Sequence, residues 1–220
     1  MQKYLRDTEE LVAAGQHEEA LKRHIWFHHH ALEHQPSMLG VRLSFALSNW
    51  RKLAKVYEPA LEALLAIRDE KTEALLSGEG NNGFFADVKA INRYLREEEK
   101  SLDLFDELHR RYPDIAATCW HYVKELAFSR QRDDLVAVYL GDPIREFESL
   151  KRRYESDRSE PSRGKRFFER SQARFVENCL RLIRALLALG KHREALLVQE
   201  KALAVLEDDQ IRGAIPAEEA

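Results

Sequence analysis

The sequence has little of what marks several common classes of protein. It contains only two cysteines, Cys119 and Cys179, without CxxC spacing, so we expect buried thiols rather than a disulfide framework or a cysteine-based zinc site. The longest apolar run near the C-terminus, LIRALLALG, is short and contains Arg184, so we expect no membrane span. The first residues, MQKYLRDTEELV, lack the apolar core of a secretory signal. We therefore expect a cytoplasmic protein.

An excess of charge of one sign is also missing. The sequence has 35 basic and 38 acidic residues and a net charge of −3 at pH 7, so no basic field draws it to nucleic acid. The most basic stretch, residues 145–174, is interspersed with acids and lacks the aromatic pattern of RNA-binding modules. We expect no nucleic-acid binding. The apolar content of 44% excludes wholesale disorder.

Strand-like alternation is absent, because apolar residues recur at three and four positions almost everywhere. Glycines and prolines fall mostly between these periodic stretches, and Pro59 is expected to kink the helix that contains it. We predict an all-α fold with roughly ten helices in a single domain, residues 1–220. The predicted helices are 3–14, 17–34, 37–47, 50–76, 84–111, 114–129, 132–140, 143–155, 165–189 and 192–207.

Two polar segments interrupt the helices. Residues 77–83 (SGEGNNG) and 155–165 are candidates for mobile loops, and 209–220 is expected to be a disordered tail. The first loop spells GxGxxG, but no strand precedes it and Glu79 would repel phosphate. We interpret it as a connection between helices.

One short motif occurs twice: GQHEEAL at residues 15–21 and GKHREAL at 190–196. Over residues 176–207, which include the second copy, the pattern resembles a tetratricopeptide repeat (TPR), and weaker copies cover 1–36, 34–66 and 116–140. The resemblance implies that Gly190 makes the turn, and that Ala195 and Ala202 lie where two helices cross closely. It also implies that they face the side chains of Leu182, Ile183 and Leu186. The predicted helix 84–111 fits no copy.

The resemblance implies a TPR-like array of antiparallel helix pairs, an α-solenoid, with a concave groove lined by the first helix of each pair. Aligned to the family, the candidate partner-binding residues are Arg42, Trp120, His121, Lys124, Arg181 and Arg184. An apolar anchor flanked by cations suits an acidic protein or peptide. The alternative is that these charged side chains only form ion pairs within the chain.

Five histidines lie between His24 and His34, and His30, Glu33 and His34 spell HxxEH, the zinc motif of one class of metallopeptidases. On a helix these rings form at best two i,i+4 pairs that do not converge, and neither pair has a third ligand nearby in the sequence. We interpret them as packing and surface histidines. We assign no metal, no cofactor and no catalytic residue.

The function that fits best is a non-enzymatic protein-protein interaction module that binds a protein or peptide in a concave groove. An immunity or antitoxin-type inhibitor of one toxin is an alternative within the binding proteins. A metal-dependent hydrolase using the His24–His34 helix is the alternative among enzymes. A small homo-oligomer is compatible with the sequence, and nothing in it names the partner.

Overall fold

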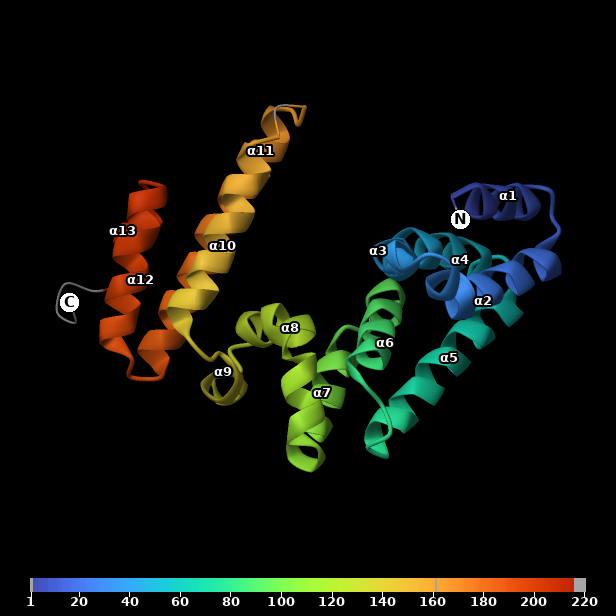
Figure 1. Cartoon of the computed structure of the whole chain (residues 1–220), viewed down its shortest axis with the longest axis horizontal. Coiled ribbons are helices and arrows are strands. Elements are labelled where there is room, and N and C mark those ends of the chain that lie inside the picture. Colours follow the sequence, from blue (N-terminus) through green and yellow to red (C-terminus); the bar gives the residue numbers. More distant parts are fainter. Residues whose placement is uncertain (1, 161, 216–220) are drawn as a thin grey trace. The chain divides into compact units, whose positions relative to one another are not determined.

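The computed structural model describes residues 2–160 and 162–215. All regular elements among these residues are helices and none is a strand, which confirms the predicted all-α fold. Figure 1 shows the helices in chain order. The chain divides into two compact units, Met1–Val123 and Lys124–Ala220, which we call unit 1 and unit 2. A single domain was expected from the sequence, and the boundary between the units falls inside one helix, Pro113–Ser129.

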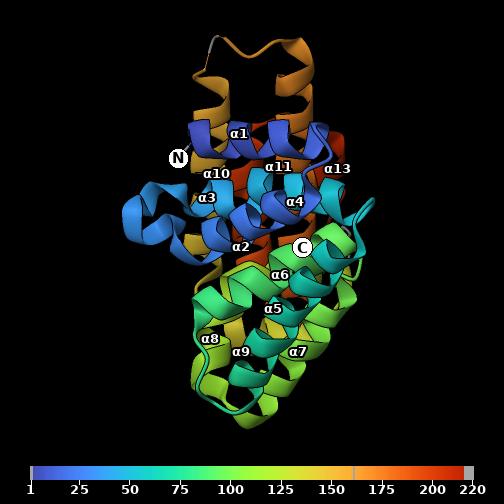
Figure 2. The same cartoon turned by 90° about the vertical axis from the view of Figure 1, so that its right-hand side faces the viewer.

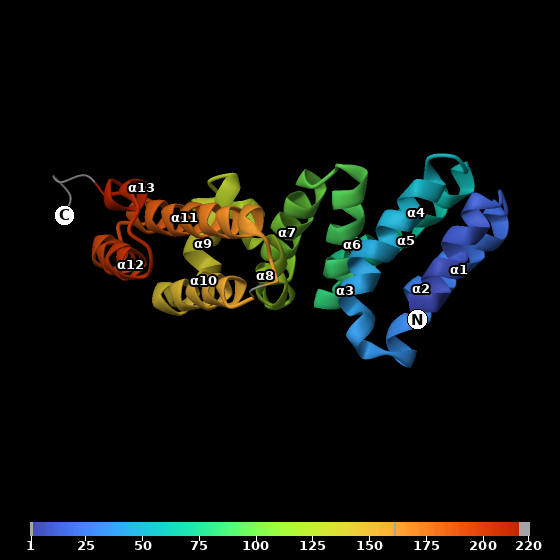
Figure 3. The same cartoon turned by 90° about the horizontal axis from the view of Figure 1, so that it is seen from above.

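Unit 1 is a series of helices joined by short turns. Its elements are α1 (Gln2–Ala13), α2 (His17–His34), the 3₁₀ turn η1 (Pro36–Met38), α3 (Leu39–Val41), the π-helical turn η2 (Arg42–Ala46), α4 (Leu47–Ala54), α5 (Glu58–Leu76), α6 (Asn82–Leu95), α7 (Glu99–Arg111) and the first part of α8 (Pro113–Ser129). Chain neighbours pack on one another, α1 on α2 and α5 on α6. Figure 3 shows α1 and α2 side by side.

One hydrophobic core of unit 1 lies between α2, α4, α5 and α6. Trp50 is among its largest fully buried side chains, and its indole N–H donates a hydrogen bond to the carbonyl of Ala60 at 2.8 Å. A buried tryptophan thus contributes apolar area without an unsatisfied donor. The buried members of this core are Ala20, Leu21, Leu47, Trp50, Leu53, Ala60, Leu64, Ile67, Ala90 and Ile91.

The first break in the helical pattern differs from the prediction. The sequence predicts separate helices at 37–47 and 50–76. Instead the chain stays helical from Leu39 to Ala54, with the π turn in the middle, and α5 then begins at Glu58. Pro59 lies in the first turn of α5, so it does not kink the interior of a helix as the sequence predicted. The missing N–H of proline costs no hydrogen bond there, because the first N–H groups of a helix have no partner within it.

The prediction of one long helix over 84–111 is wrong, because these residues form two helices, α6 and α7. Arg96 ends α6 in the left-handed conformation, with φ of 64°. Across the break, the buried amide of Asn92 donates to the buried hydroxyl of Ser101 at 3.0 Å. A left-handed residue other than glycine costs about 1–2 kcal/mol. The buried hydrogen bond and the packing of α7 on α6 offset that cost.

In the part of unit 2 that the structure describes, the end of α8 is followed by five further helices. They are α9 (Asp133–Tyr139), α10 (Pro143–Arg158), α11 (Lys165–Ala188), α12 (His192–Val205) and α13 (Asp209–Arg212). Figure 2 shows α10 and α11 side by side as an antiparallel pair. In Figure 1, α12 runs back along α11, and the two helices pack on each other.

The contact between α11 and α12 has the predicted register. Ala195 and Ala202 are fully buried, as expected for positions of close approach. The three facing side chains predicted on α11 are buried as well, namely Leu182, Ile183 and Leu186. Gly190 makes the turn with φ of +68°, and Gly15 has φ of +75° at the equivalent place in the first copy of the motif. These angles favour glycine, which has no Cβ to clash. The unit is therefore compatible with a helical repeat.

The predicted disordered tail is partly helical. Asp208 accepts hydrogen bonds from the backbone N–H groups of Gln210 and Ile211 and so caps α13, and both Ile211 and Ile215 are buried. Residues 216–220 of that prediction lie outside the described residues. Pro161, in the predicted mobile loop 155–165, also lies outside them. Mobility of this loop and of 77–83 stays a prediction.

Candidate functional site

The six candidate partner-binding residues are divided between the units. Arg42, Trp120 and His121 belong to unit 1, and the other three, Lys124, Arg181 and Arg184, belong to unit 2. Lys124 and Arg181 line one hollow, and Arg181 and Arg184 line the next. The structure thus brings together the three candidates of unit 2.

Three hollows adjoin one another along α11. The first, of about 110 Å³, lies between α8, α10 and α11 and is lined by Lys124, Phe128 and Arg181 among others. The second, of about 450 Å³, shares Phe128 and Arg181 with the first. The third, of about 610 Å³, shares Leu180 and Arg184 with the second and reaches α13. Because shared residues join them, we treat the three hollows as one groove and call it the α11 groove.

The α11 groove combines apolar and charged lining. Its apolar lining residues are Phe128, Leu150, Ala173, Val176, Leu180, Leu182, Ala185 and Ala188. Such a lining can receive an aliphatic or aromatic side chain of a ligand. Charged residues lie between these apolar residues. The ion pairs that the charged residues form within the chain determine which of the charges can bind a ligand.

Most cations of the groove already have an acidic partner. Lys124 Nζ lies 2.5 Å from a carboxylate oxygen of Glu146, and Arg153 lies 3.8 Å from Glu125. Arg181 pairs with Glu177 one turn away on α11. For Lys124 and Arg181 the structure shows the pairing within the chain that the sequence raised as the alternative.

Arg184 differs from the other three cations. Its side chain is exposed on α11, and among the described residues it has no ion pair or hydrogen bond. It lines both the second and the third hollow. A guanidinium in this position can bind a carboxylate of a ligand with two parallel hydrogen bonds.

The two ends of the groove differ in charge. The first hollow has three cations, on Lys124, Arg153 and Arg181, against two carboxylates. The third hollow has one cation, Arg184, against carboxylates of Glu169, Glu177 and Asp208. The end near α10 is therefore the more basic, and the end near α13 is the more acidic.

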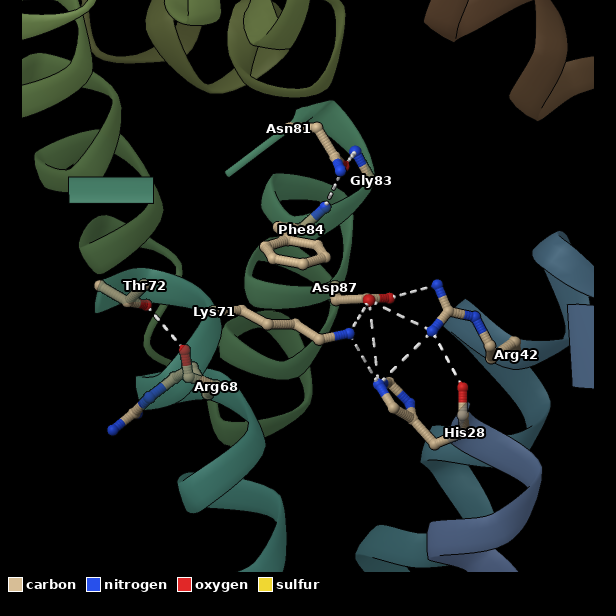
Figure 4. A network of polar contacts seen from close by, with 9 residues as sticks. All are labelled: His28, Arg42, Arg68, Lys71, Thr72, Asn81, Gly83, Phe84 and Asp87. Carbon is tan, nitrogen blue, oxygen red and sulfur yellow. Dashed lines mark hydrogen bonds and ion pairs between the residues drawn. The ribbon is translucent and has the colours of Figure 1, made fainter. Parts of the chain in front are cut away.

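Arg42 is not on an open surface, which corrects the expectation that it lines a groove. Its guanidinium points into unit 1, where Nη2 lies 2.6 Å from Oδ1 of Asp87 and Nη1 donates to Oδ2 at 3.2 Å. Nη1 also donates to the backbone carbonyl of His28 at 3.2 Å. Figure 4 shows Arg42, Lys71 and His28 around the Asp87 carboxylate. Lys71 forms the second ion pair to Asp87.

This buried network joins four elements, α2, η2, α5 and α6. The exposed fractions of the side chains are 3% for His28, 7% for Arg42, 12% for Lys71 and 3% for Asp87. Two cations therefore share one carboxylate away from water. Sequence reasoning missed Asp87 and Lys71. The sequence signal that could have revealed the network is Asp87 itself, an acidic residue within the apolar stretch FFADVKAI and on the apolar face of its helix.

Trp120 is buried in unit 1, so the expectation of an open anchor at this position is also corrected. It is 8% exposed, and its ring lies 5.8 Å from that of Phe105. His121 is exposed, and its ring lies 3.8 Å from that of Tyr122. Neither residue lines the α11 groove.

The histidines of α2 occupy separate environments. His24 and His28 are buried, whereas His34 is exposed, with the His30 side chain 45% exposed. The His30 ring is hydrogen-bonded to Glu33 at 3.0 Å. Within the described residues no group of three or more histidine, cysteine, aspartate or glutamate side chains is arranged to hold a metal ion. Likewise, no helix among them is both long and apolar enough to cross a bilayer.

In comparisons with known proteins, no family model, no curated protein and no solved structure matches this chain.

Proposed function

We propose that this protein is a non-enzymatic, TPR-like interaction module whose α11 groove binds a segment of a partner protein or peptide. The antiparallel pair of α11 and α12, with its buried alanines and glycine turn, supports the TPR-like part. We also propose that it acts in the cytoplasm, in keeping with the free, buried thiols of Cys119 and Cys179.

The observation that carries the proposal is the position of Arg184. An exposed guanidinium without an acidic partner in the described chain stands in a groove lined by Leu180 and Phe128. A partner segment with a carboxylate beside an apolar side chain could form an ion pair with Arg184 and pack against Leu180 and Phe128 at the same time. Charge-assisted hydrogen bonds of this kind fix orientation, and the apolar anchor supplies most of the affinity.

The charge difference between the two ends favours one kind of partner segment. A carboxylate fits at Arg184, and a basic group fits near Glu169, Glu177 and Asp208. A uniformly acidic segment would meet repulsion at the α13 end. We therefore propose a segment of mixed charge with an apolar anchor, bound in one direction only.

The test compares the wild type with Arg184→Glu as baits in a lysate of the native host. Proteins retained by the wild type and lost by the variant are identified by mass spectrometry, and their binding is then measured with purified components. Arg193→Glu is the matched control, because Arg193 is also exposed but lies on α12 and lines none of the three hollows.

We expect Arg184→Glu to weaken binding by roughly tenfold or more at low salt, mainly through slower association, and the difference to shrink as salt rises. Arg193→Glu should bind like the wild type. Equal binding by all three proteins would show that the α11 groove is not the binding site.

A further inference from the structure

Two histidines lie in the interior of unit 1 on one face of α2. His24 is 2% exposed and His28 is 3% exposed. Both rings contact Trp50 of α4, with centroid distances of 5.6 Å and 6.2 Å. We propose that this pair makes unit 1 an acid-sensitive element. In mildly acidic solution, uptake of protons by His24 and His28 separates α2 from α4, while unit 2 stays folded.

Among the described residues, no group beside His24 could stabilise a proton on its ring. Neither ring nitrogen has a hydrogen-bond partner among the described residues, and the ring stacks on Trp50 with 19° between the planes. No charged side chain contributes to its titration, so burial alone lowers its pKa to about 4. A protonated His24 would be an unpaired charge in an apolar core, which folded proteins avoid.

His28 meets a different obstacle to protonation. Its Nε2 lies 3.4 Å from Nη1 of Arg42 on η2 and 3.3 Å from Nζ of Lys71 on α5. Both neighbours are donors, so Nε2 must be the unprotonated acceptor, and the ring is neutral with its proton on Nδ1. A proton on Nε2 would face both cations.

Two further charged groups face His28. Asp87 on α6 lies 3.8 Å from Nε2 and favours a proton, but Arg42 and Lys71 already share this carboxylate. His29, next in the chain, disfavours a proton. Burial is the largest effect, and together with Lys71, Arg42 and His29 it lowers the pKa of His28 to about 2.

The direction of the pH effect follows from these shifts. Each ring takes up a proton near pH 6.5 once unfolded, but only at much lower pH while folded. The contribution of these two histidines to the unfolding free energy of unit 1 is therefore fully present above about pH 6.5, and it is lost as the pH falls toward about 4. Linkage of two protons raises the unfolding constant up to about 100-fold per pH unit in this range.

Unit 2 offers an internal comparison. Its only histidine is His192, which is exposed, so it lacks a buried imidazole. All three tryptophans, Trp26, Trp50 and Trp120, lie in unit 1, and their fluorescence reports its unfolding. Cys179 is the only cysteine of unit 2 and is buried, so its reactivity with a disulfide reagent reports the unfolding of unit 2.

The experiment follows urea unfolding of the full chain by tryptophan fluorescence at about pH 7, 6 and 5, above the ordinary titration range of carboxyl groups near 4. The variants are His24→Phe, His28→Gln and the double variant, since neither replacement titrates. His34→Gln is the control, because His34 is exposed on the same helix.

Between about pH 6 and 5 the unfolding constant should rise roughly 60-fold for the wild type and the control, and by roughly eightfold for each single variant. It should change much less for the double variant, in which His29 still has a pKa lowered by partial burial. In all variants Cys179 should stay protected at the urea concentrations that unfold unit 1. Equal pH dependence in the wild type and the double variant would overturn the proposal. If His28→Gln does not fold, His24→Phe alone still tests the proposal, because its unfolding constant should depend on pH through one proton fewer than that of the wild type.

Discussion

Arg42 and Asp87 stand 45 positions apart in the sequence and form a buried ion pair with N···O of 2.6 Å. Arg42 opens the π turn η2, and Asp87 lies on α6. The pair therefore joins the α3–α4 stretch to α6 through the interior of unit 1. Lys71 adds a second cation from α5, which makes Asp87 the shared centre of the network.

Because two cations depend on one carboxylate, removing Asp87 should cost more than removing Arg42. Asp87→Ala leaves Arg42 and Lys71 buried without a counter-charge, and we expect a loss of about 3–5 kcal/mol in unfolding free energy. Arg42→Met should cost less, since Lys71 still pairs with Asp87. Urea unfolding followed by tryptophan fluorescence measures both.

Glu18→Ala is the control for these variants, because it breaks the exposed Glu18–Lys22 pair at 2.8 Å, which should contribute little. If Arg42→Met destabilises unit 1 as much as Asp87→Ala does, Lys71 does not neutralise the carboxylate, and the assignment of Asp87 as the shared centre is wrong.

Trp120 gives a second prediction, which follows from its burial. Removal of a buried tryptophan side chain from beside Phe105 should lower the unfolding free energy by roughly 3–5 kcal/mol. Partner binding, measured under conditions where the variant is still folded, should not change, because Trp120 lies outside the α11 groove. A stable Trp120→Ala variant with weaker partner binding would restore the open anchor expected from the sequence.

The parts of the structure that were predictable from sequence are the local ones. The pair α11–α12 depends on Gly190, Ala195 and Ala202, all within one short stretch of chain. Their spacing follows the helical period and the turn, and the resemblance to the repeat family implied which of these side chains are buried.

The parts that were not predictable depend on non-local contacts or on irregular backbone. Arg42 was assigned to an open face by alignment to the repeat family, which assumes a regular α-helix, but a π turn adds a residue there and breaks the helical period. The break at Arg96 is stabilised in part by the side-chain hydrogen bond between Asn92 and Ser101, which no propensity encodes. The α11 groove could not be predicted without knowing where α10 and α13 lie, because residues of both line it. Of its lining residues, only Lys124, Arg181 and Arg184 were named from the sequence.

The exposed histidines lead to a third prediction. We expect the untagged protein to purify with less than one zinc per chain, and His30→Ala with His34→Ala to leave the fold intact. The reason is that His30 and His34 have no third ligand beside them among the described residues, and a stable zinc site needs three or four. Metal analysis and a thermal melt check both statements. One tightly held zinc that the double variant loses would contradict them.

The last prediction tests the helix pair that carries the TPR resemblance. Ala195 is fully buried where α12 crosses α11, whereas Ala204 on the same helix is exposed. Ala195→Trp would place a large ring in a site without room for it, and overpacking of this kind costs about 1–3 kcal/mol or more for so large a residue. Because the three native tryptophans lie in unit 1, the loss of stability in unit 2 is measured by exposure of Cys179, which should occur at a lower denaturant concentration. Ala204→Trp introduces the same ring into solvent and should leave that exposure unchanged. Equal behaviour of the two variants would mean that the close approach of α11 and α12 is not where the alanine spacing puts it, and the resemblance to the repeat family would lose its main support.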